Sequence, residues 1–543
     1  MTEWTHGRRP AEWTQWGQPK PHLSSRGRGL LRREVGATTH ADAAPISAAR
    51  LTPSALSPEA IVQLERIVGT GHVRTDDEVR ARHAGGQSYQ EIVRRRAGDA
   101  AAAPDAVVWP SEPAQIADLL RACAELGVAV VPWGGGTSVV GGLANERGRH
   151  AAVIALDLSR LDQLLSVDEI SLTATFQPGM RTPDAEAALT DYGLTLGHMP
   201  QSFERASLGG YVVTRSAGQA STGYGRIDDL VVGLRMATPI GELNLPAIPG
   251  SAAGPDLRRF VLGSEGTLGI VTEVTLRVRP RPAVREYEGW MVPSWDAGRE
   301  AFRRIAQHGP HPDIARLSDE DETRVSMAMS STAGLARGAL STYLRLRHVD
   351  RGCLVITGYE GDRSDVRHRR QGVRRQLRKA GAVPLGARAG SAWEHGRFAG
   401  PYLRDTLLDE GVLAETLETA ATWRALPGLY DGVRHALRDS LGRALVGCHI
   451  SHIYPTGASL YFTALAGAQA GHEVEQWEAA KRAANDAIVA AGGTITHHHA
   501  VGTAHRNHLE PEVGSVGLDM LRAVKERVDP AGILNPGKLL PDG

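Results

Sequence analysis

The sequence is poor in cysteine, in net charge and in long apolar runs. Its 543 residues include only three cysteines, Cys123, Cys353 and Cys448, which are far apart and odd in number. A disulfide framework is therefore not expected, and a reducing compartment fits. The 61 basic residues balance 61 acidic ones, which argues against nucleic acid as a partner. No apolar run approaches the roughly 20 residues that a membrane-spanning helix needs.

The two ends of the sequence also lack targeting signals. Residues 1–10 contain arginines without an apolar segment behind them, and the final residues carry no peroxisomal tripeptide. We therefore expect a cytoplasmic protein. Residues 1–50 are rich in Arg, Gly, Pro and Trp and predict an irregular arm that Trp13 and Trp16 anchor onto the body, with a disordered tail as the alternative.

A glycine-rich turn is the most distinctive feature of the first half. The apolar residues 128–131 predict a buried strand, and residues 132–142 follow with the sequence Pro-Trp-Gly-Gly-Gly-Thr-Ser-Val-Val-Gly-Gly. Consecutive glycines let backbone N–H groups approach an anion closely. The turn lacks the lysine of a P-loop and the spacing of G-x-G-x-x-G. From this stretch alone, a diphosphate-binding site and an ordinary turn are equally good interpretations.

Helices and strands alternate along much of the chain, and a length of 543 residues predicts more than one domain. Apolar periodicity predicts helices over residues 58–68, 113–126, 183–192, 298–307, 363–380, 472–491 and 511–528. It predicts strands over residues 105–110, 153–157, 171–176, 230–234, 286–292, 353–359 and 458–464. The arginines of residues 367–378 favour a solvated helix face over a binding patch.

Two further loops of small residues follow, at 207–218 and 263–272. Three such loops separated by strands can line one long ligand. Together they resemble the FAD-binding domain of the vanillyl-alcohol oxidase and p-cresol methylhydroxylase (PCMH) superfamily. The resemblance implies an α+β fold, with a PCMH-type FAD-binding domain of two α+β subdomains, a cap domain for the substrate and a C-terminal helical return.

The resemblance also implies domain boundaries and a cofactor site. The expected units are an arm at 1–57, the FAD-binding domain at 58–280, the cap at 281–505 and the returning segment at 506–543. Because residues 132–142 contain no His or Cys, the FAD is expected to be non-covalent. The residues implied to bind it are Pro132, Trp133, Gly134, Gly135, Gly136, Thr137, Ser138, Gln201, Ser202, Ser207, Thr214, Arg215, Ser216, Ala217, Glu265, Gly266, Thr267, Leu268, Gly269, Ile270 and Val271.

Three adjacent histidines, His497, His498 and His499, follow a Gly-Gly turn. Neighbours on a strand point to opposite faces, so such a run supplies at most two ligands from one side. No cysteine or paired carboxylate accompanies them at metal-binding spacing, and no metal is expected. Acid–base chemistry is the remaining interpretation, because histidine titrates near neutral pH.

The histidine motif resembles that of the alkylglycerone-phosphate synthase (alkyl-dihydroxyacetonephosphate synthase) family. Further matching segments are residues 13–17, 224–231, 238–239, 254–256 and 263–272. The resemblance implies a catalytic Tyr461 beside His497, His498 and His499, a phosphate-holding Arg404, and an Arg316 important near the flavin. Without it, Tyr461 would be a core strand aromatic and Arg404 a surface ion pair. The sequence departs from the family pattern at Ala500, Thr503 and Ala504.

The implied reaction exchanges the acyl chain of acylglycerone phosphate for a long-chain alcohol, without net redox change. A small-molecule lipid substrate of this kind also predicts loose contact with a membrane surface, and a homodimer is left open. The alternative function is an FAD-dependent oxidase or dehydrogenase of a 2-hydroxy acid, in which the same histidines take a proton. A non-catalytic flavin-binding protein is the third hypothesis.

Overall fold

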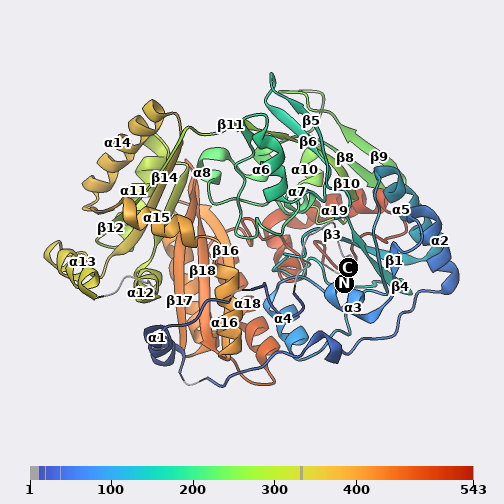
Figure 1. The fold of residues 1–543 in the computed structure, drawn as a ribbon, viewed down its shortest axis with the longest axis horizontal. Helices are drawn as coiled ribbons and strands as arrows, with labels where there is room; N and C mark the ends of the chain where they lie inside the picture. Colours follow the sequence, from blue (N-terminus) through green and yellow to red (C-terminus); the bar gives the residue numbers. More distant parts are fainter. Residues whose placement is uncertain (1–11, 19, 37, 330–333, 542–543) are drawn as a thin grey trace.

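The computed structural model describes residues 12–18, 20–36, 38–329 and 334–541. Figure 1 shows a large sheet (yellow and orange) standing beside two smaller sheets of the N-terminal half (blue to green). The C-terminal helix α19 (Glu510–Val528, red) returns to the N-terminal half. The predicted α+β fold is thus confirmed, while the exact domain boundaries stay predictions.

The first sheet delivers the glycine-rich turn. Its strands lie in the order β1 (Val73–Arg74), β2 (Ala106–Val108), β4 (Ala152–Asp157) and β3 (Val128–Trp133), and both β2 and β3 pair with β4 in parallel. Helices α2 (Pro58–Val68) and α5 (Pro113–Leu126) bury their apolar residues against it. The predicted helix bounds are confirmed: the Ser57 hydroxyl accepts from the Ala60 N–H at the start of α2, and Gly127 ends α5 in the left-handed region.

The second sheet is antiparallel and has five strands. Their order is β5 (Leu164–Asp168), β6 (Thr173–Phe176), β10 (Ile270–Arg277), β8 (Val231–Thr238) and β9 (Gly241–Leu245). Helices α6 (Thr182–Thr190) and α7 (Leu208–Thr214) pack into its core. Strand β5 was not predicted, because its exposed and half-buried residues lack an apolar run.

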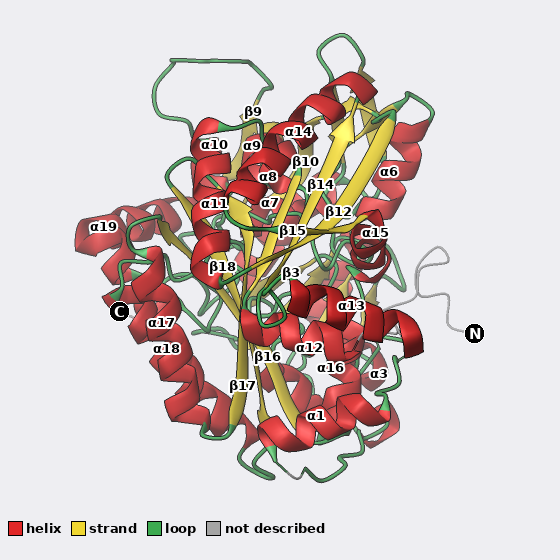
Figure 2. Ribbon diagram, turned by 90° about the vertical axis from the view of Figure 1, so that its left-hand side faces the viewer, coloured by secondary structure: helices red, strands yellow, loops and turns green. Residues whose placement is uncertain are grey.

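The third sheet forms the cap and is antiparallel throughout. In spatial order its strands are β15 (Val383–Gly386), β12 (Val284–Val292), β14 (Cys353–Gly361), β13 (Ile314–Ser318), β17 (Ala444–Ile453), β18 (Gly457–Gly467) and β16 (Val412–Thr422). Four helices bury their apolar residues in its core, namely α11 (Trp295–His308), α14 (Arg363–Lys379), α17 (Leu426–Leu441) and α18 (Glu473–Ala490). Figure 2 shows α17 and α18 side by side.

Side chains of the cap sheet alternate between a helix-covered face and a second, polar face. Leu460 and Phe462 of β18 and Cys448 of β17 lie in the hydrophobic core. Tyr461 and His449, which stand between core residues along these strands, point to the other face because side-chain direction has a period of two. We call this second face the polar face of the cap.

The arginine-rich helix α14 is less solvated than the sequence suggested. Arg370 Nε and Arg374 Nη2 lie 3.1 and 2.6 Å from Glu288 Oε2 on the buried part of β12. Part of the predicted solvated face therefore pairs with a carboxylate of the sheet.

The N-terminal arm is anchored as predicted, but it is not wholly irregular. Trp13 and Trp16 are both buried, and the Trp16 N–H donates to Asp405 Oδ2 at 2.7 Å. Residues 25–35 form the helix α1 (Ser25–Val35), contrary to the prediction of an irregular arm. Val35 packs with residues of β16 to β18 in a separate apolar cluster, and this tertiary contact outweighs the weak helical propensity of the glycines and arginines. Residues 1–11 of the predicted arm lie outside the described residues.

The C-terminal segment returns to the first sheet, as predicted. The Asn535 N–H donates to the Val130 carbonyl and the Val130 N–H to the Ile533 carbonyl, both at 2.8 Å. Strand β3 is thus flanked by residues that lie about 400 positions later in the chain. Among the described residues, no helix is long and apolar enough to cross a bilayer.

Candidate active site

The glycine-rich turn follows β3 and packs tightly against the second small-residue loop. A Cβ atom on Gly135 would lie 2.0 Å from the Arg205 carbonyl oxygen, and one on Gly134 would lie 2.3 Å from Ser207 Oγ. Gly136 has a φ of +69°, in the left-handed region that favours glycine. Only glycine therefore fits at positions 134, 135 and 136.

The backbone of this turn presents a row of free donors. Within the described residues, the N–H groups of positions 134–138 donate to no protein acceptor. Buried and half-buried N–H groups are normally paired, so five consecutive unpaired donors indicate an anion site. A diphosphate, as in FAD, fits this donor set.

The third small-residue loop meets the first. A Cβ on Gly266, which has a φ of +74°, would lie 2.3 Å from Pro132 Cγ. The Asn535 side chain donates to the carbonyls of Gly142 and Glu265, at 3.2 and 2.7 Å, and so ties the first and third loops together. The structure therefore brings together the three loops that the sequence analysis singled out.

Several of the predicted cofactor residues have structural roles for their side chains. The hydroxyl of Ser207 caps α7, and those of Thr214 and Thr267 donate to carbonyls of their own turns. The apolar side chains among them lie in hydrophobic cores, namely Leu268, Ile270 and Val271. These residues leave mainly their backbone for a ligand.

Among the remaining predicted cofactor residues, Arg215 and Ser216 of the second loop have polar partners. Arg215 Nη2 lies 3.0 Å from Asp228 Oδ2, and Ser216 Oγ lies 3.2 Å from His198 Nε2. Gln201 is exposed. The Ser202 carbonyl accepts from the backbone of the same turn. Ala217 is buried.

Arg316 and Tyr461 lie on the polar face of the cap, and His449 lies between them. Arg316 Nη1 on β13 is 3.0 Å from His449 Nε2, and His449 Nδ1 is 3.0 Å from Glu322 Oε2. The Tyr461 ring stacks on the His449 ring, with centroids 4.9 Å apart and planes inclined by 22°. Burial and the charge of Arg316 lower the pKa of His449.

Tyr461 is also the direct cross-strand partner of Glu418 on β16. Its hydroxyl donates to Thr416 Oγ1 at 3.0 Å. Burial raises the pKa of Tyr461 to about 12, so its phenol stays protonated at neutral pH. Its ring lies 6.1 Å from that of His498 and 5.5 Å from that of His499.

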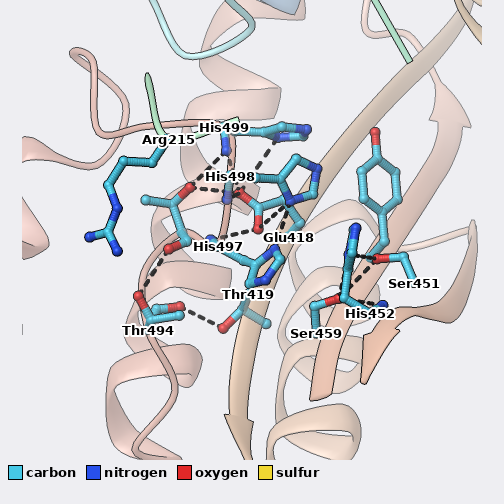
Figure 3. Close-up of polar contacts among 12 residues, drawn as sticks. Arg215, Glu418, Thr419, Ser451, His452, Ser459, Thr494, His497, His498 and His499 are labelled. Atoms are coloured by element: carbon cyan, nitrogen blue, oxygen red, sulfur yellow. Dashed lines mark hydrogen bonds and ion pairs between the residues drawn. The ribbon is translucent and has the colours of Figure 1, made fainter. Parts of the chain in front are cut away.

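The three histidines do not form a strand, contrary to the sequence expectation. Their segment is an irregular bend, in which the N–H groups of His497, His498 and His499 all donate to the Glu418 carboxylate, at 2.6, 3.1 and 2.8 Å. The Thr496 hydroxyl donates to the same carboxylate at 2.6 Å. Figure 3 shows Glu418 surrounded by the three histidines. The strand rule about opposite faces therefore does not apply here.

The histidine side chains extend this cluster in several directions. His497 Nε2 lies 2.7 Å from the Tyr454 hydroxyl, and His497 Nδ1 lies 2.9 Å from His498 Nδ1. Burial lowers the pKa of His499 to about 3 and that of His497 well below its usual value. Both rings are therefore neutral at pH 7, and each offers a ring nitrogen that can accept a hydrogen bond.

An irregularity between Ile450 and Ile453 in the pairing of β17 with β18 aims His452 toward the second loop. His452 Nε2 donates to the Gly218 carbonyl at 2.9 Å, and the hydroxyls of Ser451 and Ser459 meet beside it at 2.9 Å (Figure 3). The cap strand thus contacts the loop that is expected to line the cofactor.

Glu418, His497 and His498 form a cluster that could in principle hold a metal ion, with candidate ligand atoms within 4.8 Å of one another. However, both oxygens of Glu418 already accept backbone N–H groups. A bound metal would have to displace these hydrogen bonds. The absence of a metal stays a prediction.

The segment after the histidines joins the cap to the glycine-rich turn. The Thr503 N–H donates to the Val140 carbonyl at 3.0 Å. Glu265, a buried residue of the third loop, accepts from the N–H groups of Val501 and Gly502, each at 2.8 Å. Burial raises the pKa of Glu265 to about 7 even though these hydrogen bonds act in the opposite direction. Glu265 was predicted as a cofactor contact, but its carboxylate holds the protein backbone.

Arg404 lies on α16 (Gly400–Asp409) and is half-buried, so it is not a surface ion pair. Its Nη1 and Nη2 donate to the carbonyl and side-chain oxygens of Gln87, at 2.7 and 3.0 Å. The Gln87 N–H in turn donates to the Ser138 carbonyl at 2.6 Å. Arg404 Nε is buried and has no hydrogen-bond partner. The predicted phosphate-holding arginine is therefore two hydrogen bonds from the glycine-rich turn.

The residues that connect the predicted ones were not identified from the sequence. These residues are Gln87, Glu322, Thr416, Glu418, His449, His452 and Tyr454. Strands β16 and β17, which carry Thr416, Glu418, His449 and His452, were themselves not predicted. No sequence spacing links Glu418 to the histidines, since 79 residues separate it from His497.

Comparison with known families supports a flavin site. A family model described as an FAD binding domain matches residues 104–244, and one described as the C-terminal domain of FAD linked oxidases matches residues 281–539. The FAD binding domain model covers the glycine-rich turn and the second small-residue loop. The model of the C-terminal domain covers the cap sheet and the segment that contains the three histidines.

Individual relatives point to one enzyme family. An alkyldihydroxyacetonephosphate synthase of Trypanosoma brucei brucei is 32% identical over 91% of this chain and 82% of its own length, and one of Dictyostelium discoideum is 31% identical over 96% and 88%. A solved structure of an alkyldihydroxyacetonephosphate synthase superposes with a TM-score of 0.84 at 28% identity, covering 97% of this chain and 98% of that one. A glycolate oxidase subunit of Bacillus subtilis is more distant, at 27% identity over 80% of this chain and 89% of its own.

We predict that Gly135→Ala weakens FAD binding, because the new Cβ would collide with the Arg205 carbonyl. An overpacking cost of about 1–3 kcal/mol corresponds to a roughly 5- to 150-fold loss of affinity. Titration of the apoprotein with FAD, followed by flavin fluorescence, measures it. The control is Gly428→Ala on α17, where a Cβ meets nothing within 4 Å. Equal affinities for the two variants would contradict the prediction.

We predict that Glu265 makes the stability fall as the pH rises from about 5 to 7. A pKa of about 7 in the folded protein, against an ordinary value of 4.5, means that the folded state binds more protons in this range, so the free energy of unfolding decreases with pH. In Glu265→Gln this contribution is absent. In denaturant unfolding of both proteins between pH 5 and 8, the stability of the wild type relative to the variant should decrease as the pH rises through about 7 and level off above it. Parallel profiles would refute this assignment.

Proposed function

The chain belongs to the alkyldihydroxyacetonephosphate synthase family of FAD-dependent enzymes, and on that basis we propose that it exchanges the acyl chain of acylglycerone phosphate for a long-chain alcohol. The observation that carries the proposal is the convergence of Tyr461 and the three histidines at one end of the joined FAD loops. When bound, FAD supplies a ring system that can accept electron density from the substrate. The reaction makes an ether lipid and releases a fatty acid.

The proposed proton movements follow from the protonation states of the site. The attacking alcohol must lose its proton, and the departing acyl group leaves as a carboxylate or takes a proton. The imidazoles of His497 and His499 are neutral and can accept hydrogen bonds, and the phenol of Tyr461 is a neutral donor. His498 lies between these groups and contacts His497 directly. We assign His498 and Tyr461 to proton transfer at the reacting carbon.

Two arginines have separate proposed roles. The guanidinium of Arg404 suits the substrate phosphate, because its planar fork can form paired hydrogen bonds to phosphate oxygens. In the structure this fork is satisfied by Gln87, so a phosphate would compete with a neutral partner. Arg316 contacts His449, and the His449 ring stacks on the Tyr461 ring. We assign Arg316 to holding His449, and through it Tyr461, in place.

The substrate also bears on the surroundings of the enzyme. A long-chain alcohol is a lipid, so the proposal includes peripheral contact with a membrane from the cytoplasmic side, which co-sedimentation with vesicles tests. A homodimer stays a prediction, which light scattering tests.

The exchange activity gives the decisive prediction. Holoenzyme incubated with acylglycerone phosphate and labelled hexadecanol should form a labelled ether product. In Tyr461→Phe, loss of the proton donor should lower kcat on the order of 10²- to 10⁴-fold, with the FAD content unchanged. The control Tyr192→Phe changes a tyrosine that is 44% exposed and should retain full activity. A wild-type protein that binds FAD but forms no ether product would refute the proposed function.

The flavin linkage gives a further prediction. Because the glycine-rich turn contains no His or Cys, acid precipitation of the yellow protein should release all FAD into the supernatant. Flavin retained in the pellet would contradict non-covalent binding.

The alternative function, oxidation of a 2-hydroxy acid, has the more distant glycolate oxidase subunit as its support. Anaerobic mixing with glycolate or lactate separates the two functions. The exchange enzyme keeps its flavin oxidised, whereas an oxidase or dehydrogenase bleaches it rapidly.

A further inference from the structure

Glu418 is a buried carboxylate that no sequence motif identified. It comes from β16, is 2% exposed, and accepts four hydrogen bonds from one short segment. Three are from consecutive backbone N–H groups and one is from the Thr496 hydroxyl. In addition, His498 Nδ1 lies 3.4 Å from Glu418 Oε2. Every described donor around this carboxylate thus belongs to the histidine segment.

These contacts keep Glu418 ionised. Burial alone would favour the neutral acid, but the interactions with His498 outweigh it and hold the pKa of Glu418 well below its usual value. Hydrogen bonds from N–H groups to an ionised carboxylate are shorter and stronger than neutral ones. Removal of the carboxylate would leave the N–H groups of His497 and His498 without an acceptor and the His499 N–H with the Thr496 hydroxyl alone, which is costly in a buried site.

The carboxylate also explains how three adjacent histidines serve one site. In a strand, His498 would point away from His497 and His499. Bending the backbone around Glu418 instead places the ring of His498 beside Tyr461 and the ring of His497 against Tyr454. Register adds to this arrangement, because Glu418 and Tyr461 are directly opposite on paired strands. One residue therefore sets the distance between the histidine segment and the tyrosine.

We propose that Glu418 is the positioning residue of the site: its carboxylate fixes the backbone of residues 496–499 so that His498 and Tyr461 face the same reacting atoms. The inference rests on the proposed function for its kinetic consequence. It does not assign Glu418 any contact with substrate or FAD. Its closest analogue in enzymes is the outer residue that orients a metal-bound or catalytic histidine.

The test compares Glu418→Gln with wild-type holoenzyme. An amide cannot accept on both sides, so the segment loses part of its support while the side-chain volume is kept. We expect kcat to fall on the order of 10²-fold, as for a misplacement of about 1 Å, with KM and FAD content near wild-type values. Amide hydrogen exchange at residues 497–499 should become faster by roughly tenfold or more, as local opening becomes easier.

A matched control lies on the same segment. Glu512 accepts the Ile495 N–H at 2.9 Å and the Thr494 hydroxyl at 2.6 Å, but it is exposed and touches none of the three histidines. Glu512→Gln should leave kcat and the amide hydrogen exchange of residues 497–499 unchanged. A loss of activity in both variants alike would show a general loss of segment structure and overturn the specific role of Glu418.

A milder variant keeps the proposal testable if Glu418→Gln does not fold. Thr496→Val removes one donor to Glu418 and the acceptor of the His499 N–H, while the carboxylate keeps its three backbone partners. We expect a several-fold lower kcat and faster amide hydrogen exchange at His499. Unchanged kcat together with faster exchange would overturn the proposal, and so would unchanged exchange in Glu418→Gln.

The outcomes separate this inference from the proposed function. If wild-type holoenzyme makes no ether product, the proposed function fails. The amide hydrogen exchange of Glu418→Gln still decides whether the carboxylate holds the histidine segment. If the wild type is active and Glu418→Gln equals it, only the positioning role fails.

Discussion

The alternation of side chains in the cap sheet is the constraint on which the site depends. Four helices cover one face of this sheet, so Leu460, Phe462 and their neighbours must point there to bury apolar surface. The side chains of the residues between them therefore point to the opposite face. Tyr461 and His449 lie on that polar face because the apolar residues beside them lie in the core. A one-residue slip in the register would exchange the two sets and destroy both core and site.

Two buried carboxylates then connect the polar face to the FAD loops. Glu418 of the cap binds the backbone of residues 497–499, and Glu265 of the third loop binds that of residues 501 and 502. An irregular buried segment has N–H groups that no helix or sheet satisfies, and these two side chains take the place of a sheet partner. The histidine segment is thus held from both halves of the molecule at once. Relative motion of the halves would have to break one of these sets of hydrogen bonds.

Local sequence predicted the parts of the structure whose cause is local. Three glycines in a row, a capping Ser57 and the apolar periodicity of residues 113–126 each determine a backbone shape without distant help. The histidine segment was misjudged because its shape is imposed by Glu418, which lies 79 residues earlier than His497. Strand β16, with its many Ala, Thr and Glu residues, has no strong apolar pattern. The helix α1 was missed for a similar reason, since packing on the cap stabilises it rather than its own composition.

Ala500 shows how firmly this segment is held. Its φ is +74°, which is uncommon for a residue with a Cβ atom, and such conformations cost about 1–3 kcal/mol. Ala500 stands between the residues bound by Glu418 and those bound by Glu265, so the direction of the chain is set on both sides of it. The hydrogen bonds on the two sides overcome the local preference, and the chain turns sharply at a residue that is not glycine. The strain therefore lies at the one position between the three histidines and the backbone that contacts the glycine-rich turn. The hydrogen bonds that tie this segment to Glu418 and to Glu265 thus outweigh the preference of Ala500 for a negative φ.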